Sequence, residues 1–184
     1  LGLYRFQSFS ATISYSRELI GGIYAGLSER SITETSYDLS KTAFTANAGL
    51  LMEFEAVKGF SAGLSLLNIG SRVRYDETDA DYIVPPFTLR IGVREEWVFS
   101  PVFTNSSYLD FIKVNDQEFK VALADEMLFL GDFLVRLGYV YNDPVRFFSA
   151  GIGMKTERFR IDYAVSPYMY NLGIDNSISL TYKF

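Results

Sequence analysis

The sequence of 184 residues contains no cysteine and no histidine, and each absence removes a kind of functional site. Without cysteine the chain can form neither a disulfide framework nor a thiolate metal site. Without histidine it lacks the usual general base of hydrolases and acyltransferases, so most catalytic schemes lose their central residue. We therefore expect a protein that is not an enzyme and holds no cofactor or metal ion.

Long apolar runs and clusters of basic residues are also missing. No stretch approaches the roughly 20 apolar residues that a membrane-spanning helix needs, which excludes a helical membrane protein. The net charge is −5 and the basic residues are scattered, so the sequence predicts no nucleic-acid partner. The chain has neither an initiator methionine nor a signal peptide, and we interpret it as a processed form or a fragment.

The chain is rich in aromatic residues, with 16 Phe and 13 Tyr, and its apolar and polar residues alternate. The clearest example is the last eight residues of the chain. The apolar residues there are Ile178, Leu180, Tyr182 and Phe184, and they alternate with the polar residues Ser177, Ser179, Thr181 and Lys183. Because successive side chains of a strand point to opposite faces, we expect the apolar set to face lipid and the polar set to face inward. Between Phe148 and Lys155, small residues and charges share one face, which predicts a crowded polar interior.

The same alternation predicts a single all-β domain over residues 1–184, an antiparallel transmembrane β-barrel. We expect eleven strands, at residues 4–15, 19–32, 42–55, 60–75, 86–95, 98–109, 117–129, 133–142, 147–156, 159–169 and 174–184. The sixth is the weakest because Pro101 inside it would lose a ladder hydrogen bond. In the fourth, the apolar face changes near Leu66 and Leu67, which predicts a β-bulge.

Short and long connections alternate between these strands, as they do in outer-membrane barrels, where the periplasmic turns are short. The tight ones fall at 16–18, 56–59, 95–97, 130–132 and 157–158, and the longer ones at 33–41, 76–85, 110–116, 143–146 and 170–173. An odd count favours a fragment with further strands upstream. The alternative is a ten-stranded barrel in which the Pro101 segment is a loop.

Charged residues fall on the predicted inner face: Glu53, Glu55, Arg72, Arg74, Arg90, Arg94, Glu126, Arg136, Arg160 and Asp162. They are expected to form ion pairs that brace the wall, or else to line a conducting path. A soluble lipocalin-type barrel would instead place the apolar face inside. The acidic residues Asp76, Glu77, Asp79 and Asp81 have oxygen ligands suited to calcium, but lack EF-hand spacing, so a solvated loop is favoured. Tyr163, Tyr168, Tyr170 and Tyr182 fit an interfacial aromatic girdle.

Several segments resemble the C-terminal half of the PorV and PorQ type of outer-membrane barrel, relatives of the FadL-type channels. They are FTLRIGVREEW, FKVALADEMLFLGDFLVRLGYVYNDP, FFSAGIGMKTERFRIDYAVSPY, SISLTYKF, and GFSAGLSLLNIGSRVRYD followed by PP. The resemblance implies a fourteen-stranded barrel in the outer membrane of a Gram-negative-type bacterium, surrounded by lipid. It implies a structural or partner-binding role at the cell surface, of the kind associated with a secretion system, or alternatively transport of hydrophobic small molecules. It also implies that Phe184 is the signal read by the barrel-assembly machinery.

Overall fold

The computed structural model describes residues 6–36, 39–54, 56–70, 73–74, 82–83 and 85–183. Within these ranges the regular elements are all strands. No helix in the described part of the chain is long and apolar enough to cross a membrane. The acidic residues at 76–81, with Glu55, Arg72 and Phe184, lie outside the described ranges.

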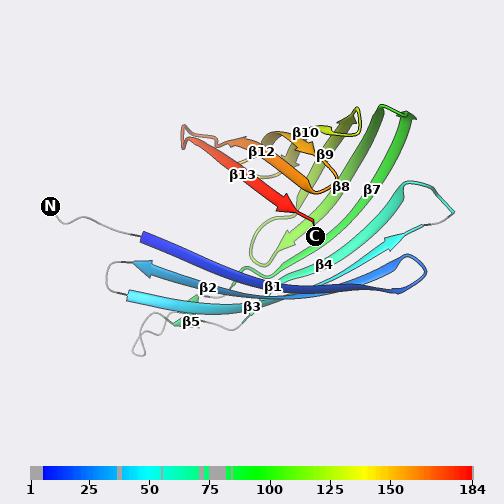
Figure 1. The fold of residues 1–184 in the computed structure, drawn as a ribbon. Helices are drawn as coiled ribbons and strands as arrows, with labels where there is room; N and C mark the ends of the chain where they lie inside the picture. The colour runs from blue at the N-terminus through cyan, green and yellow to red at the C-terminus, as the bar shows by residue number, and fades with distance from the viewer. Residues whose placement is uncertain are drawn as a thin grey trace. The chain divides into compact units, whose positions relative to one another are not determined.

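Thirteen strands are described, and eleven of them form one sheet (Figure 1). They are β1 (Phe6–Ile20), β2 (Ile23–Ser36), β3 (Leu39–Glu53), β4 (Phe60–Gly70), β5 (Val73–Arg74), β6 (Tyr82–Ile83), β7 (Thr88–Ser100), β8 (Phe103–Val114), β9 (Lys120–Phe129), β10 (Phe133–Tyr141), β11 (Phe148–Lys155), β12 (Phe159–Pro167) and β13 (Ile174–Tyr182). The sheet follows chain order, except that β7 follows β4 because β5 and β6 pair with each other. The predicted all-β class, with eleven antiparallel strands, is confirmed.

Contacts divide the chain into two compact units. The first consists of Leu1–Met52, Gly63–Arg90 and Val114–Gln117, so it holds β1, β2, nearly all of β3 and most of β4. The second consists of Glu53–Ala62, Ile91–Lys113 and Glu118–Phe184, so it holds most of β7 and all of β9 to β13.

The first hairpin turns at Gly21 and Gly22, and the turn predicted at residues 16–18 is wrong. The backbone φ angles of these glycines are 46° and 75°. Two consecutive residues in the left-handed region form a tight hairpin turn whose twist matches that of the strands, and glycine adopts this conformation without strain. Residues 16–18 consequently remain in β1, which has a register shift between Glu18 and Ile20.

Pro101 lies in a turn, so the predicted turn at 95–97 and the strand through Pro101 are both wrong. β7 continues to Ser100, Pro101 and Val102 form the turn, and β8 begins at Phe103. The fixed φ of proline suits a turn, and its missing N–H is not required there. The ten-stranded alternative is wrong as well, because the chain on both sides of Pro101 is strand.

The long connections predicted at 33–41 and 110–116 are largely strand. β2 and β3 remain paired as far as Ser36 and Leu39. Cross-strand hydroxyl hydrogen bonds accompany this pairing, at 2.9 Å between Thr33 and Thr42. β8 likewise continues to Val114. The tight connections predicted near 56–59, 130–132 and 157–158 are confirmed.

The structure has a β-bulge in β4 one residue beyond the predicted Leu66 and Leu67. Gly63 lies beside Leu51, whereas Gly70 lies beside Thr45. Seven residues of β4 therefore span six residues of β3, which requires one extra residue in β4. The extra residue is at Asn68, whose φ is 58° and whose backbone N–H donates to the Asn47 side chain at 2.7 Å.

The exposed side of the sheet is the apolar one. Leu134 is the single large hydrophobic side chain that is buried in the described part of the chain, while Thr45, Ser61 and Ser106 are buried polar residues. Leu180 and Ile91 are 69% and 49% exposed. A half-buried sheet of a soluble protein shows the opposite arrangement, and a membrane barrel shows this one. These exposures contradict the lipocalin-type alternative, in which the apolar face packs inside.

Candidate functional site

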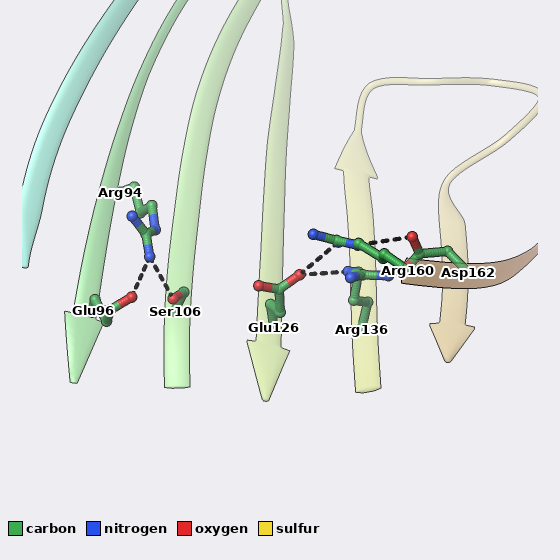
Figure 2. Close-up of polar contacts among 7 residues, drawn as sticks. All are labelled: Arg94, Glu96, Ser106, Glu126, Arg136, Arg160 and Asp162. Atoms are coloured by element: carbon green, nitrogen blue, oxygen red, sulfur yellow. Dashed lines mark hydrogen bonds and ion pairs between the residues drawn. The ribbon is translucent and has the colours of Figure 1, made fainter. Parts of the chain in front are cut away.

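A network of four charged residues spans strands β9 to β12 (Figure 2). Arg136 on β10 donates from Nε to Glu126 Oε2 at 2.6 Å and from Nη1 to Asp162 Oδ1 at 2.6 Å. Arg160 on β12 donates from Nε to Asp162 Oδ2 at 2.8 Å, and its Nη2 lies 3.7 Å from Glu126 Oε2. Two cations and two carboxylates thus alternate on one side of the sheet, which we call the inner face.

Strand register places these residues together. Arg136 is the direct cross-strand partner of Glu126, and Asp162 is the partner of Gly153 on β11, the strand that separates β10 from β12. A Cβ atom on Gly153 would lie 2.4 Å from Asp162 Oδ1 and 3.4 Å from Arg136 Nη1. The glycine therefore leaves the space in which Arg136 and Asp162 meet across β11. This is the crowded polar interior expected between Phe148 and Lys155.

A second cluster continues the network toward β7. Arg94 forms an ion pair with Glu96 and donates to Ser106 Oγ at 3.2 Å (Figure 2). Its guanidinium also lies 5.9 Å from the centre of the Tyr108 ring. Ser106 is the cross-strand partner of Glu126. Polar side chains of β7, β8, β9, β10 and β12 therefore lie in one row, and the glycines of β11 leave the space that the row crosses. We call this set the charged row: Arg94, Glu96, Ser106, Glu126, Arg136, Arg160 and Asp162.

Two guanidinium donors in the charged row are buried without a hydrogen-bond partner among the described residues, Arg94 Nε and Arg136 Nη2. The ion-paired side chains of Glu126, Arg136 and Asp162 are 24%, 26% and 19% exposed. Such partial burial strengthens ion pairs relative to a fully exposed surface. The row can therefore brace the wall at the inner face, with these two N–H groups enclosed by the side chains around them.

The structure brings together five of the ten predicted inner-face charges: Arg94, Glu126, Arg136, Arg160 and Asp162. Arg90 lies on β7 and is exposed, and Glu53 ends β3 and is exposed. Arg74 lies in β5, with no described side chain, and Arg72 is outside the described ranges. The described part of the chain has no cluster of acidic residues able to hold a metal ion.

Sequence reasoning missed Glu96, Ser106 and Gly153 as parts of this site. The turn predicted at 95–97 places Glu96 outside any strand. Its position two residues after Arg94 nevertheless indicates that the two side chains lie on the same face. Ser106 required the correct position of the Pro101 turn. Gly153 could not be singled out, because its role depends on the register of two strand pairs.

Aromatic rings lie near both ends of the strands. Near the tight turns, Phe103 stacks on Phe99 and Phe129, with ring centres 5.4 and 5.2 Å away, and Tyr182 lies 4.9 Å from Phe159. At the other ends, Phe111 stacks on Phe119 at 5.7 Å and Tyr139 meets Phe147 at 6.1 Å. Two aromatic girdles flank the apolar band of outer-membrane barrels. Of the four predicted girdle tyrosines, Tyr182 lies in such a group, and Tyr163 donates to Asn176.

No protein-family model and no curated protein sequence matches this chain. A solved structure described as a KdgM porin is similar to it in fold, with a TM-score of 0.56 and 11% sequence identity over 98% of each chain. The fold is that of a transmembrane β-barrel. This likeness supports the outer-membrane barrel class and not the PorV or FadL type in particular. At so low an identity it says nothing about the molecule that the chain binds or conducts.

Proposed function

We propose that the chain forms part of the wall of an outer-membrane channel of a Gram-negative-type bacterium. Its apolar outer face would contact lipid, and the charged row would line a polar path. The observation that carries this proposal is the inverted polarity of the sheet. Large apolar side chains such as Ile178 are exposed, at 78%, while the ion pairs of the charged row lie on the opposite side.

The inverted polarity has a physical explanation in a membrane. Apolar residues on a lipid-facing wall lose no hydration, whereas Arg136 and Glu126 would be costly there and need water or each other. Alternation along each strand allows both requirements to be met at once. A porin-like channel uses this arrangement, with a polar interior and an apolar exterior.

Additional strands would complete the wall in this proposal. β1 and β13 stand at the two ends of the described strand order. An unpaired strand edge in hydrocarbon leaves backbone groups unsatisfied at several kcal/mol each, so each edge needs a partner. The family resemblance favours upstream strands of a larger barrel, with Phe184 as the signal for the barrel-assembly machinery.

The two roles implied by the family resemblance remain predictions. A FadL-type path for hydrophobic molecules requires an apolar inner surface, and the charged row across β7 to β12 disfavours this for that part of the wall. A PorV-type role would instead use the outer loops to hold a protein partner. In the loop between β10 and β11, Asp143 Oδ1 accepts the backbone N–H groups of Val145 and Arg146, and these hydrogen bonds would help to hold the loop in one conformation for such a contact.

Conductance measurements test the proposal. The complete protein is reconstituted into planar bilayers, and stepwise conductance is expected. Glu126→Gln and Arg94→Gln should shift ion selectivity in opposite directions, because they remove charges of opposite sign from the inner face. Asp132→Asn, which removes an exposed carboxylate from the β9–β10 turn, outside the charged row, serves as the control. Intact, folded protein without conductance would contradict the channel and favour the partner-binding role.

A further inference from the structure

The outer face of β1 to β4 has an open groove of about 390 Å³. Ala25 and Ala48 form its floor, and Leu27, Leu50 and Leu64 are among its walls. These four strands are neighbours in the sheet (Figure 1). The groove is almost wholly apolar and lies on the face that the proposed orientation turns toward lipid.

Cross-strand register explains the groove. Ala25 on β2 is the partner of Leu50 on β3, and Leu27 is the partner of Ala48. Small and large side chains therefore alternate both along and across the two strands. Each alanine leaves a depression between leucines that are 67% exposed at Leu27 and 46% exposed at Leu50. A flexible hydrocarbon chain fits such a depression better than a flat wall does, because it gains contacts on three sides.

Arg17 lies at one end of this groove, as the cross-strand partner of Ala25. It is exposed, and it makes no hydrogen bond or ion pair within the described part of the chain. Among the described residues of β1 to β3 it is the one basic residue on the outer face. A cation on a lipid-facing wall is destabilising unless it reaches the interface or a counter-charge.

We propose that this groove binds one phospholipid, with an acyl chain over Ala25 and Ala48 and the phosphate paired with Arg17. The apolar floor and the unpaired guanidinium are complementary to the two parts of that molecule. Arg17 lies four residues before Gly21, so it is close to the end of β1 that carries the tight turn. The phosphate would therefore lie in the membrane leaflet at the end of the strands that carries the tight turns. This site is on the outer wall and does not depend on whether the inner face conducts.

Native mass spectrometry of the purified full chain in detergent tests the site, with phosphatidylglycerol and diacylglycerol of the same acyl chains as separate probes. The wild-type chain is expected to retain one phosphatidylglycerol. Arg17→Gln should weaken phosphatidylglycerol binding about tenfold, the loss of one charge-assisted contact, and leave diacylglycerol binding unchanged. Ala48→Phe should weaken the binding of both lipids, because its ring fills the floor.

Two matched variants serve as controls. Ala46→Phe places the same ring two residues away on the same face of β3, outside the groove. Arg30→Gln removes an inner-face cation that donates to Thr12. Neither should change lipid binding. Equal effects of Ala46→Phe and Ala48→Phe, unchanged phosphatidylglycerol affinity in Arg17→Gln, or a second copy of the chain in place of the lipid would each overturn the proposal. Since Arg17→Gln alters only an exposed side chain, it remains informative if Ala48→Phe does not fold.

Discussion

The guanidinium of Arg136 donates to the carboxylate of Asp162 at 2.6 Å, although a complete strand, β11, separates the strands that carry them. Contacts between strands two apart are uncommon because the side chains of the middle strand normally stand between them. Here the middle strand contributes Gly151 opposite Arg136 and Gly153 opposite Asp162. The inner face is thereby braced over three strands by a single ion pair.

A methyl group on Gly153 should break this contact. The new Cβ atom would lie 2.4 Å from Asp162 Oδ1, so the carboxylate must move away from Arg136. We expect Gly153→Ala to lower the free energy of unfolding by about 1–3 kcal/mol, the range for overpacking. Reversible urea unfolding in lipid vesicles measures this. In Gly63→Ala, where the nearest atom is 3.6 Å from the added Cβ, the change should be much smaller; equal losses would mean that the space at Gly153 has no special role.

Removing the Asp162 charge should also destabilise the sheet. In Asp162→Asn, Arg136 and Arg160 each lose a charge-assisted hydrogen bond, and we expect a loss of about 1.5–3 kcal/mol. Asp175→Asn is the matched control, because Asp175 pairs with Arg146 at 3.4 Å and both side chains are about half exposed. A double-mutant cycle with Glu126→Gln should show coupling. Strictly additive losses would contradict a connected row.

The assignment of faces is tested by placing the same charge on each. Leu50 is on the outer face, and Leu50→Arg should lower the free energy of unfolding in lipid vesicles by about 2–4 kcal/mol if it lies near the midplane. Ser14 is on the inner face of β1, opposite Ser28, so Ser14→Arg should cost much less. The inner-face residue Asn47 would be a poor site for this control, because arginine there would also break the side-chain hydrogen bonds of Asn47 to Ser28 and to the Asn68 backbone N–H. Similar losses in the two variants would contradict the faces assigned.

A small polar group interrupts the apolar outer face. Ser107 Oγ donates to Asp125 Oδ1 at 2.7 Å, and Asp125 is the partner of Leu137, which is on the outer face. A carboxylate facing lipid is destabilising, although less so than an arginine. Asp125→Leu should therefore raise the stability of the folded protein in lipid vesicles, while Asp132→Leu, in the β9–β10 turn, should not. A loss of stability in Asp125→Leu would indicate that this part of the face is not in contact with lipid.

Much of the fold could be predicted because alternation along a strand is a local property. The apolar and polar sets of β13 and the tight turn at 130–132 follow from a few consecutive residues. The first hairpin turns later than predicted because Gly21 and Gly22 adopt the left-handed backbone that permits the tight connection, which leaves Arg17 and Glu18 within β1.

The candidate site could be predicted only in part, because it depends on register across several strands. Glu126 and Arg136 are joined by one tight turn, so their pairing follows from the hairpin itself. The contact between Arg136 and Asp162 depends on two further strand pairings and on the absence of a side chain at Gly153. Alternation identifies the face of the sheet on which a residue lies, but not the residue of the neighbouring strand with which it pairs.

The β10–β11 loop provides a prediction for pH dependence, because Asp143 holds it together. Burial disfavours the ionised carboxylate, but the backbone N–H of Arg146, the Lys120 side chain and the N–H of Val145 outweigh it and lower the pKa of Asp143. Lys120 Nζ lies 3.0 Å from Asp143 Oδ2. A carboxylate with a lowered folded pKa binds fewer protons in the folded state than in the unfolded state, so it stabilises the fold above its ordinary pKa of about 3.9.

This stabilisation should be complete at pH 6 and lost as the pH falls through the lowered pKa of Asp143. Amide hydrogen exchange at Val145 and Arg146, corrected for the intrinsic effect of pH, should therefore show protection that declines in acid. In Asp143→Asn, which retains an acceptor oxygen but no charge, protection should be lower at pH 6 and nearly independent of pH in this range. Protection that declines equally in the wild-type chain and in Asp143→Asn would assign the acid sensitivity of the loop to a group other than Asp143.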